Sequence, residues 1–154
     1  MLSLERQVVE RFPRWFSGRR GRLIRPLWKS YGRVSGLDEA QAFLDANAHL
    51  TGFAFVEAAL EHLGVRYTVD QVERERIPAN GRMLIVANHP SGAIDALALL
   101  HLVGAVRRDV KIVANDLLCA LDGLRELLLP LRILGGRPSA DSLAAIEQAL
   151  ANEQ

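Results

Sequence analysis

His89 and Asp95 are the residues whose types and spacing best suit acid–base chemistry in this sequence. Five consecutive apolar residues at 83–87 precede them, and such a short run predicts a strand buried on both faces. Pro, Ser and Gly at 90–92 then break the regular structure, and residues 93–103 favour a helix. We therefore expect His89 at the tip of a strand and Asp95 in the first turn of the following helix.

This placement would let the two side chains act as a pair. The positive end of a helix dipole favours an ionised carboxylate, so Asp95 could hold one imidazole nitrogen of His89. The other nitrogen would stay free to take a proton, which is how a general base is oriented. A second interpretation stays open, in which His89 is a solvent-exposed turn residue and Asp95 is an ordinary residue of a helix start.

The run Asn88-His89-Pro90-x-Gly92-x-x-Asp95 resembles the first motif of the glycerolipid and lysophospholipid acyltransferase superfamily. Five residues separate His89 from Asp95, where most of that superfamily has four, and Pro90 follows the histidine. This variant resembles the branch of haemolysin-like proteins and ornithine-lipid acyltransferases. The resemblance implies that His89 deprotonates the acceptor hydroxyl or amine and that Asp95 orients it. It also implies substrate-binding roles for Asn88 and Gly92, and it implies no metal ion or tightly bound cofactor.

Gly135, Gly136 and Arg137 form a second candidate binding element. They follow an apolar run at 127–134 that predicts another strand. If that strand is parallel to 83–87, both elements lie beyond the carboxyl ends of one sheet, where open α/β sheets bind ligands. Glycines let a backbone approach a phosphate, and an arginine can bind one through two hydrogen bonds. The resemblance also places a Gly and an Arg here, whereas the alternative is an ordinary turn.

The surrounding elements predict an α/β fold with a mainly parallel sheet flanked by helices. The strand at 83–87, the helix at 93–103 and a second buried strand at 110–114 would form a right-handed βαβ unit. The alternating segment 65–69 predicts a strand near the sheet edge. Further helices are expected near Ser35 and Asp38, between Thr51 and Gly64, over 115–125, and after a Ser139 cap.

The composition fits a single domain with a substantial core, since 49% of the 154 residues are hydrophobic and 24% are charged. One cysteine excludes a disulfide framework and a thiol-based metal site. The sequence shows neither the apolar run of a transmembrane helix nor the pattern of a secretory signal. We expect a cytoplasmic protein that lies peripherally on the inner face of the membrane.

Residues 1–34 form a basic, amphipathic arm ahead of an α/β domain at 35–154. The arm combines Trp15, Phe16 and Trp28 with a series of arginines, which suits the headgroup layer of an anionic membrane. Two alternatives stay open: an N-terminal helical segment that packs through its apolar side, and a nucleic-acid-binding arm, which we consider less favoured.

The resemblance implies an acyltransferase that moves a fatty acyl group from acyl-ACP or acyl-CoA to a lysophospholipid or similar lysolipid. The alternative is a non-catalytic lipid-binding or membrane-surface module. The family's pattern continues with a further block that has no counterpart before Gln154, so we expect an incomplete sheet and the N-terminal part of such an enzyme. Weak activity, marginal stability and self-association through an open sheet edge would follow.

Overall fold

The computed structural model describes residues 36–115, 118, 121–131 and 139–152. The predicted basic arm lies outside the described residues, and so does the stretch that contains Gly135, Gly136 and Arg137. The chain divides into two compact units, residues 1–48 and residues 49–154, which are treated separately below. The domain boundary expected at residues 34 and 35 stays a prediction.

The described part of the first unit is the helix α4, Leu37–Ala46. Gly36 precedes it with a φ of 75°, a backbone conformation that glycine adopts without steric cost. Asp38 and Glu39 lie in the first turn, where the helix dipole favours negative charge. At the other end, the Asn47 side chain donates a 2.9 Å hydrogen bond to the Phe43 carbonyl. The helix expected near Asp38 is therefore present.

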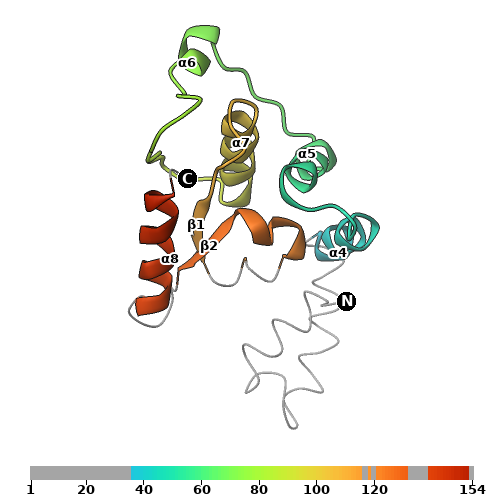
Figure 1. The fold of residues 1–154 in the computed structure, drawn as a ribbon. Coiled ribbons are helices and arrows are strands. Elements are labelled where there is room, and N and C mark those ends of the chain that lie inside the picture. The colour runs from blue at the N-terminus through green and yellow to red at the C-terminus, as the bar shows by residue number, and fades with distance from the viewer. Residues whose placement is uncertain (1–35, 116–117, 119–120, 132–138, 153–154) are drawn as a thin grey trace. The chain divides into compact units, whose positions relative to one another are not determined.

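Two helices, α5 (Gly52–His62) and α7 (Ala93–Gly104), pack against each other in the second unit and form much of its core (Figure 1). Their apolar residues recur every three or four positions, so each helix buries one side. A Cβ atom at Gly104 would overlap the Phe53 ring, which shows how closely the helices approach. The buried positions are Phe55, Val56, Ala59 and Leu60 on α5, and Leu97, Leu100 and Val103 on α7.

The end of α5 is fixed by a glycine, as the sequence predicts. Gly64 has a φ of 64°, and its N–H donates to the Glu61 carbonyl at 3.0 Å. The N–H of Val65 donates to the Leu60 carbonyl, also at 3.0 Å. These two bonds form a Schellman motif, which satisfies carbonyls that the helix end would leave unpaired.

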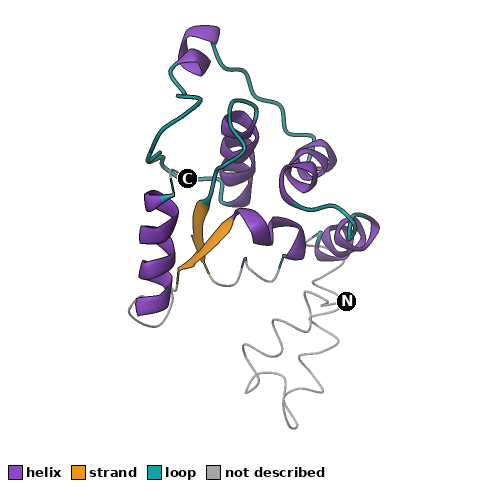
Figure 2. Ribbon diagram, in the orientation of Figure 1, coloured by secondary structure: helices purple, strands orange, loops and turns teal. Residues whose placement is uncertain are grey.

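The sheet of the described residues contains two parallel strands, β1 (Ile112–Asn115) and β2 (Leu128–Leu131), shown in orange in Figure 2. Their register pairs Ile112 with Leu128 and Asn115 with Leu131. The connection between them includes a 3₁₀ helix, η2 (Asp122–Leu127), which contacts α5. The expected α/β fold is confirmed.

The last helix, α8 (Ala140–Ala151), contacts β2 and begins as the sequence predicts. The Ser139 hydroxyl accepts a 3.1 Å hydrogen bond from the Ser142 backbone N–H, so Ser139 is a true N-cap. Pro130 lies within β2 opposite Ala114 and is exposed. Its missing N–H suits a position at the edge of a sheet.

The expected strands at 83–87 and 65–69 are wrong for this structure. Neither segment pairs with any described strand, although residues 82–89 are free of helix and connect two structured regions. Leu84 is 76% exposed and Val86 is 85% exposed, so the apolar run is not buried on both faces. A strand needs a neighbour that accepts its backbone hydrogen bonds, and the apolar pattern alone does not supply one.

The helix expected over 115–125 is also only partly correct. In the described portion Leu118 has a 3₁₀ conformation, and η2 begins at Asp122 and continues to Leu127. Gly123 lies near the start of η2 instead of near a helix end, and a Cβ there would overlap the Phe55 ring. The close approach of α5, which is a tertiary contact, therefore explains this glycine. A five-residue helix, α6 (Gln71–Glu75), occupies the charged stretch before Ile77.

Candidate functional site

The candidate site is built on the turn that precedes α7. Gly92 is the N-cap of this helix, with φ 66° and ψ −125°, a backbone conformation that other residues rarely adopt. Pro90 comes two residues earlier, and the residue before a proline is disfavoured in the helical conformation, so the helix does not extend back through His89. The sequence therefore starts the helix at Ala93 and places Asp95 in its first turn, as expected.

The Asp95 carboxylate lies beside the His89 imidazole. The Ser91 backbone N–H donates a 2.6 Å hydrogen bond to Asp95 Oδ2. His89 Nδ1 lies 3.7 Å from the same oxygen, which is an ion-pair distance and slightly longer than a hydrogen bond. The turn thus fixes the carboxylate and brings one imidazole nitrogen close to it. Such contacts are often long without substrate and shorten in the reacting complex.

The two side chains differ in their access to solvent. The His89 side chain is 57% exposed, whereas that of Asp95 is 31% exposed. The imidazole can therefore meet an incoming molecule, while the carboxylate is more sheltered from solvent. This is the order that a base and its orienting group require.

An exposed apolar segment leads to His89. Leu84 and Val86 are two residues apart, so in an extended chain their side chains lie on the same side. Asn88 is also exposed and directly precedes the imidazole. A hydrocarbon chain that approached the imidazole along this segment would find apolar surface there.

The structure describes part of the candidate binding set, whose roles stay predictions. Asn88, His89, Gly92 and Asp95 fall within eight consecutive positions, and the structure brings His89 and Asp95 together. The element at 135–137 lies outside the described residues, so its role stays a prediction. In the part of the chain that is described, no group of three or more His, Cys, Asp or Glu side chains could hold a metal ion.

Sequence reasoning missed two polar contacts that hold the surroundings of α7. The Tyr67 hydroxyl lies 2.6 Å from Nδ1 of His101, which joins the 65–69 segment to the last turn of this helix. Burial raises the pKa of Tyr67 above its usual value, and the Arg74 charge opposes that shift. The second contact is the ion pair between the buried Arg107 and Asp109. The sequence signal for that pair was an Arg-x-Asp spacing between a helix and a strand.

Comparison with known proteins gives independent information about the family. A family model described as acyltransferase matches residues 29–153. The lyso-glycine lipid O-acyltransferase of Phocaeicola vulgatus is 32% identical over 117 residues, which cover 75% of this chain and 41% of that protein. The protein of the same name in Bacteroides thetaiotaomicron is 35% identical over 99 residues, covering 64% and 36% respectively.

The matches cover only part of the length of each relative. The chain spans about two fifths of the length of the curated relatives it matches. No solved structure matches the chain.

No helix of the described segments has both the length and the apolar character needed to cross a membrane.

Proposed function

This chain belongs to the acyltransferase family, and we propose that it transfers a fatty acyl group to the hydroxyl of a lysolipid. The observation that carries the proposal is the His89–Asp95 pair at the start of α7. The relatives named as lyso-glycine lipid O-acyltransferases support an amphiphilic acceptor with a free hydroxyl. We take a lyso-glycine lipid, or a lysolipid with a similar headgroup, as the acceptor.

The proposed reaction uses the two ring nitrogens of His89 differently. Nδ1 faces Asp95, so Nε2 accepts the proton of the acceptor hydroxyl. The acceptor oxygen then attacks the thioester carbonyl, and a new ester bond forms while the carbon–sulfur bond breaks. The imidazolium returns the proton to the departing thiolate. Asp95 holds the ring in orientation and stabilises its positive charge during the step.

The other predicted binding residues complete the proposal. The thioester is acyl-CoA or acyl-ACP, and both donors carry phosphate groups. Arg137, with Gly135 and Gly136, would bind such an anionic group of donor or acceptor. Asn88 directly precedes His89 and Gly92 is the N-cap of α7, and both would contact the acceptor.

A second candidate function is a lipid-binding module without catalysis. The exposed Leu84 and Val86 favour it, because they offer apolar surface whether or not transfer occurs. The two functions differ in a single result, which is the formation of an ester product.

A transfer assay tests the proposal. The protein is incubated with acyl-CoA or acyl-ACP and, in turn, with lyso-glycine lipid, lyso-ornithine lipid and lysophosphatidic acid, and products are identified by mass spectrometry. We expect a new ester with at least one acceptor and release of one thiol per ester. Binding of these lipids without any ester from either donor would instead support the non-catalytic module.

We also propose that the basic arm holds the protein peripherally on an anionic membrane, which suits a cytoplasmic location. Replacing Arg19, Arg20 and Arg22 with glutamine should weaken binding to phosphatidylserine vesicles by roughly 100-fold, since each basic residue near such a surface contributes about 1 kcal/mol. The matched control replaces Arg66, Arg74 and Arg76 in the same way. Equal vesicle co-sedimentation of both triple variants at low salt would contradict a specific role for the arm.

A further inference from the structure

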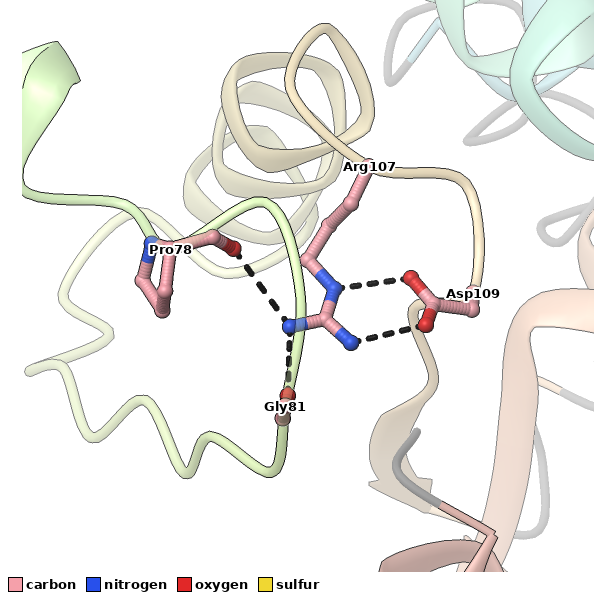
Figure 3. A network of polar contacts seen from close by, with 4 residues as sticks. All are labelled: Pro78, Gly81, Arg107 and Asp109. Atoms are coloured by element: carbon pink, nitrogen blue, oxygen red, sulfur yellow. Dashed lines mark hydrogen bonds and ion pairs between the residues drawn. The ribbon is translucent and has the colours of Figure 1, made fainter.

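Arg107 is a buried cation with an unusually complete set of hydrogen bonds. Its side chain is 4% exposed, whereas that of its partner Asp109 is 47% exposed. Nε donates to Asp109 Oδ1 at 2.7 Å, and a terminal nitrogen donates to Oδ2 at 2.7 Å. The other terminal nitrogen donates to the Gly81 carbonyl at 2.7 Å and to the Pro78 carbonyl at 3.4 Å (Figure 3). A buried charge is tolerated when it is paired and hydrogen-bonded in this way.

These bonds join two parts of the chain that are far apart in sequence. Arg107 comes just after α7, and its own backbone N–H donates to the Val103 carbonyl at 2.9 Å. Pro78 and Gly81 belong to the loop that opens the segment 82–89, as Figure 3 shows. The guanidinium therefore attaches the beginning of this segment to the C-terminal end of α7.

The opposite end of the same segment is attached to the N-terminal end of α7. There the Ser91 N–H binds Asp95, and His89 lies beside that carboxylate. Residues 82–89 pair with no described strand, so no ladder with β1 or β2 fixes their path. Among the described residues, polar contacts at the two ends of α7 hold the start and the end of this segment.

We propose that Arg107 is a positioning residue for the acyl transfer proposed above, because it fixes the start of the segment whose other end carries His89. This inference rests on that proposed function. Asp95 lies on α7 and its carboxylate accepts the Ser91 N–H, so its position does not depend on the loop that contains Pro78 and Gly81. Loss of the Arg107 bonds lets the segment shift along α7 and changes the approach of the imidazole to Asp95 and to the acceptor.

The geometry requires an arginine. A planar guanidinium binds both carboxylate oxygens of Asp109 with one edge while its remaining nitrogen reaches the two loop carbonyls. A lysine keeps the charge, but its single ammonium cannot reproduce this fork. Arg107→Lys should therefore be intermediate between the wild type and Arg107→Gln.

Limited proteolysis gives the first readout, and it does not depend on activity. Arg82 is exposed and directly follows Gly81, so trypsin cleavage after Arg82 reports release of the segment's start. Cleavage after Arg66 serves as the internal reference. We expect Arg107→Gln to raise the Arg82 to Arg66 cleavage ratio by about tenfold, as expected when local opening costs less, and Arg107→Lys to raise it less.

Steady-state kinetics give the second readout. Misplacement of a reacting group by about 1 Å can cost about 100-fold in rate. We expect kcat of Arg107→Gln to fall by about 10- to 100-fold while KM for the acyl donor changes by less than about twofold. The control is Arg108→Gln, since Arg108 is exposed and its guanidinium lies over the Phe53 ring, 4.6 Å from the centroid.

The outcomes separate this inference from the proposed function. A wild-type kcat in Arg107→Gln, or an unchanged Arg82 to Arg66 ratio, overturns the positioning role. If circular dichroism shows that Arg107→Gln does not fold, Arg107→Lys carries both measurements with the same criteria. If the wild type acylates no acceptor, the proposed function is overturned. Faster cleavage after Arg82 in Arg107→Gln would then support only the anchoring of the segment by Arg107.

Discussion

Replacing His89 with alanine is expected to lower kcat/KM for acyl transfer by about 10²–10⁴-fold, the usual contribution of a general base. The structural reason is the exposed imidazole, whose Nδ1 lies 3.7 Å from the Asp95 carboxylate. Without the base, the acceptor hydroxyl must lose its proton to water while it attacks the thioester. The measurement is the initial rate of ester formation under identical acceptor and donor concentrations.

The controls for this prediction separate chemistry from folding. His89 is largely solvent-exposed, so its loss should leave the circular dichroism spectrum and the denaturation midpoint unchanged. His62→Ala, which alters an exposed histidine in the last turn of α5, should keep wild-type activity. Asp95→Asn should reduce the rate less than His89→Ala, because the base remains but loses its charged partner. Near-normal turnover by His89→Ala would remove His89 from the mechanism.

The second large effect concerns the packing of α7 on α5. Leu100→Ala should lower the free energy of unfolding by about 2–5 kcal/mol, the range found when a buried leucine is truncated. Leu100 is 3% exposed, on the helix that packs against α5. The truncation removes favourable apolar burial and leaves a cavity in this core. Urea denaturation followed by circular dichroism measures the change.

Leu143→Ala is the matched control for this substitution. Leu143 lies on α8 and is 48% exposed, so the same truncation should change the unfolding free energy by less than about 0.5 kcal/mol. Because α7 also carries Asp95, Leu100→Ala also tests whether the packing of this helix is needed to hold the Asp95 side of the candidate site. Equal midpoints for the two variants would show that the α5–α7 contact contributes little to stability.

The sequence alone determined the features that depend on neighbours a few residues away. Gly64 ends α5, Ser139 caps α8, and the turn at Gly92 starts α7, because each involves bonds between residues close in the chain. For the same reason, the proximity of His89 and Asp95 could be predicted, since they flank one short turn. Their catalytic roles stay predictions until activity is measured.

Tertiary structure decided the features that need a distant partner. The apolar run at 83–87 has the composition of a buried strand, yet the described structure gives it no pairing neighbour and leaves Val86 exposed. The parallel pairing of β1 with β2 and the burial of Arg107 against Gly81 likewise depend on segments far apart in sequence. The composition of a segment shows how much free energy the burial of its apolar side chains would contribute. Whether the segment becomes a strand depends on a neighbour for its backbone hydrogen bonds, which the rest of the fold must supply.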